Sequence, residues 1–469
     1  MADKLILVLD CGATNVRAVA VNIHGEIKAM YSIHNTTKPD PFYPGGLIWD
    51  TDQIWEKFCI CTRKIATEIR IGDISAITIT TFGVNGAPVD KHGNLLYPVI
   101  SWQCQRTIPF MEQIDKYIPY ADIYSVCGLF KYSFNTIFVL LWLKENRPEI
   151  LEDMEGFLFI SSLYVHKLTG NFINDTTMAG TSMLTDIKTR KFSGTLLSAT
   201  GLPDRFFVLG EPGTIAGKLL PEVASEMGLT DGIPVILAGH DTQFALVGSG
   251  AEANEVVLSS GTWEILMTRS GNIQLGEKAR KAGLTHELDV QQGLYNCGVQ
   301  WLGSGVLEWI KSNFYKYEME CTPEKIYDIM IAEAEEAGPQ FRITTVEPSL
   351  DMNKGIISGL GLHTTRGQIY RAALESLAIK TNDSLKLLEQ DGNFSAKSVI
   401  VVGGGSKNML WNQIRSNAMN LPLKINRKTE TTVLGAAITS MVSLGIFDTL
   451  EQGIQATAQD YLWIYPEER

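Results

Sequence analysis

The sequence predicts an α/β protein made of two domains, each containing one β-hairpin that turns on glycine and threonine. At 469 residues the chain exceeds a single ordinary core, so two domains of about 200–250 residues are expected. Short apolar β-runs alternate with helical stretches, which is the pattern of α/β domains. Residues 5–17 and 256–263 each form an apolar run that enters a small, polar Gly/Thr turn, and a second apolar run follows.

The two hairpins resemble one another, although they lie about half a chain apart. Glycine lets the backbone approach a ligand closely, so such a turn exposes N–H groups and a hydroxyl to an anion. One copy is equally typical of an ordinary β-hairpin, and that interpretation stays open for each copy taken alone. Two copies suggest a duplicated nucleotide clamp, with one phosphate-binding hairpin in each domain.

The other elements follow from the periodicity of apolar residues. Short apolar runs predict strands at 74–81, 234–238 and 398–402, each ending in a glycine-containing turn; apolar residues at helical spacing predict helices at 138–145, 157–168, 304–314 and 367–390. Small residues predict a further helix at 242–247, and another should run from the glycine-rich turn at 403–408 through residue 417. We interpret Gly248-Ser249-Gly250 as the domain junction and a hinge, which places the domains at 1–248 and 249–469.

Composition and charge limit the classes of function. The formal net charge of −12 argues against nucleic acid or an anionic membrane as partner, because both require a basic patch. It is compatible with ATP, which local N–H groups and a metal can bind, and with a neutral second substrate. We expect a cytoplasmic protein without structural zinc, since no signal peptide or membrane span is visible and the seven cysteines form no C-x-x-C pair. A homo-oligomer stays open.

Common nucleotide-binding motifs are not matched. Residues 213–219 resemble a P-loop, but the segment is one residue short and no Ser or Thr follows Lys218. No G-x-G-x-x-G follows a strand, which disfavours a dinucleotide-binding unit. The chain therefore needs another way to bind ATP.

Four motifs in this order resemble the FGGY family of carbohydrate kinases. They are the strand with Asp10-Cys-Gly12-Ala-Thr14 and Arg17, then Gly239-His240-Asp241, Ser260-Gly261-Thr262, and Gly403-Gly404-Gly405 with Asn408. The resemblance runs from residue 5 to about residue 465. It implies two ribonuclease-H-like, actin-like ATPase domains that close on ATP and a sugar in a central cleft. Within the family, the L-fuculokinase branch is the most similar, on segments 80–84, 95–98, 159–163, 238–246 and 258–267.

The implied reaction is phosphoryl transfer from ATP to a sugar hydroxyl, which needs a carboxylate to accept the hydroxyl proton. The resemblance implies that Asp241 is this general base; the alternative is that it caps a helix. Asp10 ends the first strand beside the first hairpin and is expected to hold Mg²⁺, with Asp241 as a second carboxylate. The alternative for Asp10 is a residue that stabilises the turn.

The resemblance also implies residues that bind ATP. Gly12, Thr14, Asn15 and Arg17 are expected at the γ-phosphate, Gly261 and Thr262 opposite them, and Gly404, Gly405 and Asn408 at the adenosine, with Gly305 as a further candidate. Arg17 also fits an exposed position on a strand, and that interpretation stays open. Residues 432–437 are expected to pack behind the adenosine site.

The resemblance implies that the sugar lies between four side chains. They are Asn85, Trp102, Arg106 and His240, beside Asp241. A core Trp102 and a surface Arg106 are the alternatives. Xylulokinase-like members tend to carry Asp where Cys104 stands, and His240 resembles the rhamnulokinase and fuculokinase branches. Both positions favour a 6-deoxyketohexose, although Asn85 stands where Asp would be expected.

The expected activity is thus phosphorylation of L-fuculose to L-fuculose 1-phosphate. Alternatives are L-rhamnulose, then D-xylulose or D-ribulose, and from another class an actin-like or chaperone-like ATP switch. Because phosphate-binding elements flank the junction at 248–250, binding of sugar and ATP is expected to draw the domains together.

Overall fold

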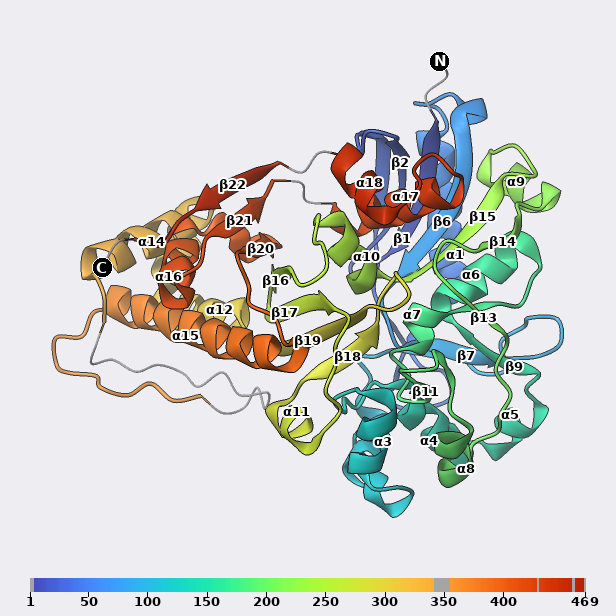
Figure 1. Cartoon of the computed structure of the whole chain (residues 1–469), viewed down its shortest axis with the longest axis horizontal. Coiled ribbons are helices and arrows are strands. Elements are labelled where there is room, and N and C mark those ends of the chain that lie inside the picture. Colours follow the sequence, from blue (N-terminus) through green and yellow to red (C-terminus); the bar gives the residue numbers. More distant parts are fainter. Residues whose placement is uncertain (1–3, 341–354, 428–429, 458–459, 468–469) are drawn as a thin grey trace.

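The computed structural model describes residues 4–340, 355–427, 430–457 and 460–467. Two large sheets organise it, and Figure 1 shows them in separate halves of the molecule. The first sheet has the order β14-β15-β6-β1-β2-β3. Its strands are β1 (Leu5–Cys11), β2 (Asn15–Asn22), β3 (Ile27–His34), β6 (Ile74–Thr81), β14 (Ile215–Lys218) and β15 (Pro234–His240).

The second sheet repeats the plan of the first. Its order is β18-β19-β17-β16-β20-β21-β22. The strands are β16 (Val256–Ser260), β17 (Trp263–Ser270), β18 (Thr285–Leu288), β19 (Tyr295–Leu302), β20 (Val399–Val402), β21 (Leu423–Asn426) and β22 (Tyr461–Ile464). In each sheet an antiparallel hairpin, β1–β2 or β16–β17, leads into parallel strands, β6 and β15 or β20 and β21. The predicted duplication of the hairpin is therefore confirmed by topology.

Smaller elements complete the first half of the chain. The short strands are β4 (Lys38–Pro39), β5 (Leu47–Trp49), β7 (Gly86–Val89), β8 (Val99–Ile100), β9 (Gly156–Phe159), β10 (Asn174–Asp175), β11 (Thr185–Asp186), β12 (Lys191–Phe192) and β13 (Leu209–Gly210). The helices are α1 (Thr51–Ile65), α2 (Ile108–Glu112), α3 (Tyr120–Cys127), α4 (Thr136–Asn146), α5 (Pro148–Asp153), α6 (Ile160–Thr169), α7 (Thr176–Ala179), α8 (Gly194–Thr200), α9 (Pro221–Met227) and α10 (Asp241–Gly248).

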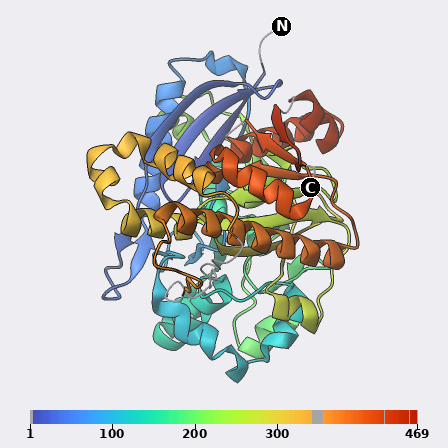
Figure 2. The same cartoon turned by 90° about the vertical axis from the view of Figure 1, so that its left-hand side faces the viewer.

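Helices cover one face of the second sheet, and Figure 2 shows them in front of it. The helices of this half are α11 (Glu277–Ala282), α12 (Ser304–Phe314), α13 (Lys316–Cys321), α14 (Ile326–Ala337), α15 (Arg366–Gly392), α16 (Met409–Met419), α17 (Thr431–Ser443) and α18 (Leu450–Ala456). The long α15 begins with a capping box between Thr365 and Gln368, and it ends at Asn393 in the left-handed conformation.

The last two helices leave the second sheet and pack on the first. Figure 1 shows α17 and α18 (red) beside the blue strands of the first sheet. Their apolar side chains share one buried cluster with those of β1, β2, β6, β15 and α10. At the crossing of α10 and α17, a Cβ added to Gly248 would lie 1.8 Å from the carbonyl oxygen of Thr431, and one added to Gly435 would lie 1.9 Å from that of Phe244. Only glycines permit this approach.

Most expected elements are confirmed within a few residues, and two expectations are wrong. The run 157–168 is not one helix, because Gly156–Phe159 forms β9, paired antiparallel with β7, and only Ile160–Thr169 is helical. Residues 432–437 pack on α10 and the first sheet rather than behind the glycine-rich turn. The boundary at 248/249 separates the strands of the two large sheets, and as a domain division it stays a prediction. Within the described ranges, no helix is long and apolar enough to cross a membrane.

Candidate active site

Two predicted carboxylates lie at the same edge of the first sheet. Strands β1, β6 and β15 are parallel neighbours, and Asp10 and His240 are near the carboxyl ends of β1 and β15. In the ladder Asp10 is opposite Thr80 and His240 is opposite Thr81, so one strand separates them. Asp241 follows His240 directly and begins α10. The carboxyl ends of parallel strands are where α/β sheets bind ligands.

Asp10 is buried and fully hydrogen-bonded. Its Oδ2 accepts from Nε and Nη2 of Arg17, at 2.9 and 2.5 Å, and its Oδ1 accepts from the Thr80 hydroxyl at 2.9 Å. Arg17 forms a second ion pair with Glu430, the residue before α17. Arg17 is therefore not a surface arginine, since it joins a strand of the first sheet to a helix that follows the second sheet.

Asp241 is the first helical residue of α10, and the N-cap of that helix is His240. Its Oδ1 accepts from the N–H of Thr242 at 2.6 Å, and 31% of its side-chain surface is exposed. Burial raises the pKa of Asp241, the charge of His240 opposes this rise, and the charge of Asp10 adds to it. A raised pKa makes a carboxylate a more effective general base, because its pKa then lies closer to the operating pH.

His240 lies between two acidic side chains. Its Nε2 is 3.4 Å from Oδ1 of Asp241, and its Nδ1 is 3.4 Å from Oε2 of Glu287 on β18. Burial alone lowers the pKa of His240, but the hydrogen bond and charge of Glu287, together with Asp241, raise it above the ordinary value. The preceding Gly239 has φ +141°, and a Cβ there would lie 2.0 Å from Oδ1 of Asp175, so this turn requires glycine.

The turn after β6 supports Asn85. Val84 has φ 64°, a rare conformation for a β-branched residue. Two hydrogen bonds hold this conformation: the Val84 N–H donates to the Thr181 hydroxyl, and the Val84 carbonyl accepts from the Thr136 hydroxyl. Asn85 Oδ1 accepts from the Trp49 indole at 2.9 Å and from the Trp102 N–H at 3.1 Å. Its Nδ2 is buried without a hydrogen-bond partner. A buried amide with a free donor is suited to bind a hydroxyl.

Two predicted sugar contacts differ in the structure. Trp102 is 36% exposed and can present its ring, so its role stays a prediction. Arg106 corrects the expectation, because its side chain is fully buried and forms an ion pair with Asp40 at 2.6 Å. Its guanidinium also donates to the Tyr97 hydroxyl and stacks on Tyr43 and Trp142, at 4.4 and 4.7 Å from the ring centroids. Arg106 is therefore neither a surface residue nor exposed for direct contact with the sugar.

The predicted phosphate residues lie on two hairpin turns. In the first turn the N–H of Gly12 donates to the carbonyl of Asn15 at 2.8 Å, and the side chains of Thr14 and Asn15 are exposed. In the second turn Thr262 is exposed, and its carbonyl accepts from the N–H of Gly305 at 3.2 Å. The structure thus brings Gly305 beside Gly261 and Thr262, two of the other residues predicted to bind ATP.

The glycine-rich turn after β20 lies against the second hairpin. A Cβ on Gly403 would lie 2.6 Å from the carbonyl oxygen of Ser260, and one on Gly405 would lie 2.1 Å from its hydroxyl. A Cβ on Gly404 would meet nothing within 4 Å, and Gly404 is exposed. Asn408 caps α16, since its Oδ1 accepts from the N–H of Trp411, and its Nδ2 donates to the Tyr370 hydroxyl at 3.2 Å. An amide group carries two hydrogens, so contact of Asn408 with the adenosine stays a prediction.

A buried ion pair beneath the second hairpin was not predicted. Arg415 pairs with Glu264 and donates to the Ser260 hydroxyl at 2.9 Å. Glu264 also accepts from the Trp301 indole at 3.0 Å, so the pair joins β16, β17 and α16. The one available signal was a glutamate inside an apolar strand, since a charge there is expected to need a buried partner. No comparable pattern in the sequence pointed to Glu287, Gln243 or Trp49.

The donor set of the first sheet fits Mg²⁺. This ion usually keeps several waters and is held by one or two carboxylates together with substrate phosphates. Asp10 and Asp241 supply two carboxylates at one sheet edge, and their charges interact. Because Arg17 and Thr80 already bind Asp10, coordination through water suits it better than direct coordination.

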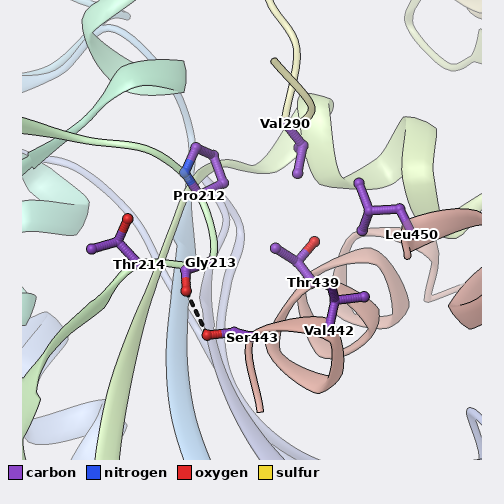
Figure 3. A pocket seen from close by; sticks show the side chains of 8 residues that line it. All are labelled: Pro212, Gly213, Thr214, Val290, Thr439, Val442, Ser443 and Leu450. Carbon is purple, nitrogen blue, oxygen red and sulfur yellow. Dashed lines mark hydrogen bonds between the residues drawn. The ribbon is translucent and has the colours of Figure 1, made fainter. Parts of the chain in front are cut away.

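A pocket of about 310 Å³ lies elsewhere, between α17, α18 and the turn before β14 (Figure 3). The residues that line it are Pro212, Gly213, Thr214, Val290, Thr439, Val442, Ser443 and Leu450. Ser443 donates to the carbonyl of Gly213 at 2.5 Å across it. No charged side chain and no candidate site residue lines this pocket, so we assign no substrate to it.

Comparison with known proteins identifies the family. The model of the N-terminal domain of the FGGY family of carbohydrate kinases matches residues 5–248, and that of the C-terminal domain matches residues 256–444. The chain belongs to the FGGY family of carbohydrate kinases. The FGGY fold explains why two similar sheets each present one Gly/Thr hairpin.

Relatives and solved structures agree with this assignment. An L-fuculokinase from Escherichia coli (strain K12) is 47% identical over 100% of this chain and 98% of that protein. One from Haemophilus influenzae is 42% identical over 98% of this chain and 99% of that protein. The crystal structure of xylulose kinase from Rhodospirillum rubrum has a TM-score of 0.88 at 18% identity, covering 99% of this chain and 94% of that one. The FGGY chain therefore has the two-domain, ribonuclease-H-like fold of sugar kinases.

Proposed function

We propose that this FGGY kinase transfers the γ-phosphoryl group of ATP to L-fuculose and produces L-fuculose 1-phosphate in L-fucose breakdown. The position of Asp241 supports the chemistry: a partly exposed carboxylate with a raised pKa, at the edge of the sheet that holds Asp10 and beside His240. The full-length similarity to proteins named L-fuculokinase supports the choice of sugar.

In this proposal each residue acts on a particular group of the substrates. Asp241 accepts the proton of the attacking sugar hydroxyl as its oxygen bonds to the γ-phosphorus and ADP leaves. Asn85 Nδ2 and His240 donate hydrogen bonds to sugar hydroxyls, and Trp102 presents its ring to the sugar. The hydroxyls and the remaining N–H groups of the two hairpin turns, other than those of Gly12 and Gly261, bind the phosphates from opposite sides. The glycines at 404 and 405 leave room for the adenosine.

Asp10 and Asp241 would hold Mg²⁺ when ATP binds. The ion supplies positive charge that neutralises the phosphate oxygens. We expect EDTA to stop turnover and added Mg²⁺ to restore it, whereas turnover that survives EDTA would contradict the proposal. We also propose a cytoplasmic enzyme, since its co-substrate is ATP and all seven cysteines are free thiols.

Substitution of the base tests the chemistry. Asp241→Asn keeps the shape of the side chain and removes the proton acceptor, so kcat should fall about 10²–10⁴-fold while ATP and sugar still bind. Asp231→Asn, at an exposed position, is the matched control. A wild-type kcat in Asp241→Asn would mean that Asp241 is not the base.

A panel of sugars tests the substrate. Initial rates with L-fuculose, L-rhamnulose, D-xylulose, D-ribulose and glycerol should give the highest kcat/KM for L-fuculose. A higher value for L-rhamnulose would assign the chain to the sister activity. ATP turnover that no sugar stimulates would instead favour an ATP switch.

A further inference from the structure

Polar side chains of the second domain reach the ring of His240 through one glutamine. Gln243 lies on α10, one turn after His240, and it is 1% exposed. Asn296 on β19 donates its Nδ2 hydrogen to Oε1 of Gln243. Gln243 Nε2 in turn donates to Oε2 of Glu287 on β18 and lies 3.3 Å from Nδ1 of His240.

These contacts fix the orientation of the Gln243 amide. Its oxygen can only accept, and Asn296 supplies the donor. Its NH₂ group carries two hydrogens, and Glu287 and His240 Nδ1 lie on that side. A flipped amide would place its oxygen against the Glu287 carboxylate and its NH₂ against the Asn296 NH₂, which loses both hydrogen bonds.

The amide orientation decides which nitrogen of His240 carries a hydrogen. In the neutral ring Nδ1 accepts from Gln243, so the hydrogen is on Nε2. In the protonated ring Nδ1 donates to Glu287, 3.4 Å away, and Nε2 still carries its hydrogen. Nε2 faces Asp241 Oδ1 at 3.4 Å and the turn at Gly83, where a Cβ would lie 2.7 Å from it. In both states the nitrogen beside the base is therefore a donor.

We infer that Gln243, held by Glu287 and Asn296 across the domain interface, is a positioning residue that keeps His240 Nε2 a permanent hydrogen-bond donor at the reaction centre. This inference rests on the proposed sugar kinase activity. A donor beside Asp241 binds a lone pair of the sugar hydroxyl while Asp241 takes its proton. Because Glu287 and Asn296 belong to the second sheet, the first domain has this donor only when the second domain is packed against it.

The state of the ring can be read by NMR of protein labelled with ¹⁵N in its seven histidines, with His240→Gln to assign the signal. Wild-type protein should show hydrogen on Nε2. Gln243→Leu keeps the size of the side chain but removes the donor to Nδ1 and leaves the Glu287 acceptor. Its neutral ring should therefore carry hydrogen on Nδ1, facing Glu287.

Kinetics should change with the ring. In Gln243→Leu the KM for L-fuculose should rise about 10–100-fold, the effect of one lost hydrogen bond to a substrate at a buried site, while the KM for ATP stays unchanged. Glu287→Gln keeps an acceptor oxygen for Gln243 and should retain the Nε2 hydrogen. Glu320→Gln, on an exposed helix of the second domain, is the matched control. Asn296→Leu removes one of the two contacts that hold the amide, so part of the neutral rings should carry the hydrogen on Nδ1, which provides a second test if Gln243→Leu does not fold.

Three results would overturn the inference: hydrogen on Nδ1 in the neutral wild-type ring, an Nε2 hydrogen retained in both Gln243→Leu and Asn296→Leu, or a change in sugar KM without any change in the ring. The NMR measurement needs no turnover. A wild-type enzyme that fails on L-fuculose would therefore refute the proposed sugar and leave the inference on His240 to be decided by its own spectrum.

Discussion

Gly435→Ala should separate α10 and α17, which cross in close contact on the first sheet. The new Cβ would lie 1.9 Å from the carbonyl oxygen of Phe244 on α10, whereas ordinary contact begins at 3.4 Å. To restore ordinary contact between this Cβ and the carbonyl oxygen, α10 and α17 must separate locally by about 1.5 Å. Both sides of this contact are backbone, so no side chain can move aside.

The consequence for catalysis follows from the position of Asp241 on the same helix, three residues before Phe244. A displacement of about 1 Å costs an enzyme on the order of 10²-fold in rate, so kcat should fall by that order. Overpacking should also destabilise the fold by about 1–3 kcal/mol, and each kcal/mol lowers the Tm by about 2–4 °C in domains of this size.

The assay is kcat and Tm measured on the same preparation. Gly194→Ala is the matched control, because it opens α8 with an ordinary φ and has nothing within 4 Å of its new Cβ, so both quantities should stay near wild type. If Gly435→Ala keeps the wild-type kcat and Tm, the close crossing is not needed. If only the Tm falls, the position of α10 does not limit catalysis.

Three further outcomes are expected. Asn85→Asp should raise the sugar KM about tenfold, because the bonds from Trp49 and Trp102 to Oδ1 remain while the free Nδ2 donor is lost. An unchanged KM would remove Asn85 from the sugar site. Asp241 must be ionised to act, and its pKa is raised, so the loss of kcat/KM on acidification should begin at a pH above the pKa of an ordinary aspartate, about 3.9. His240→Gln removes a charge that lowers the pKa of Asp241, so it should move this loss of activity to still higher pH. A shift to lower pH would contradict the assignment. Small-angle scattering with L-fuculose and a non-hydrolysable ATP analogue should show a smaller radius of gyration than the free enzyme, and an unchanged radius would count against domain closure.

Local sequence patterns predicted the elements that carry the chemistry. Both hairpins, the strand that ends at His240 and the helix after it are short segments whose apolar period and turn residues are sufficient to recognise them. The order of four such motifs then identified the family. Asp241 and Asp10 meet because the carboxyl ends of parallel strands share one edge, a consequence of topology rather than of either motif alone.

Partners distant in the sequence decided where the predictions were wrong. Arg106 stands in a polar segment, and its buried position became evident only with Asp40, 66 residues earlier, as its counter-charge. The apolar run at 157–159 fits a helix or a strand equally well by apolar period, and pairing with β7 decides for the strand.

The return of α17 and α18 to the first sheet bears on how the polypeptide matures during synthesis. The N-terminal half can form its strands early, but α10 covers only part of one apolar face of its sheet until residues 431–456 have left the ribosome. An exposed sheet face of this kind is prone to aggregate with other nascent chains. For this kinase the last tenth of translation therefore completes the first domain, and a ribosome that stalls shortly before it would release a chain with an open core.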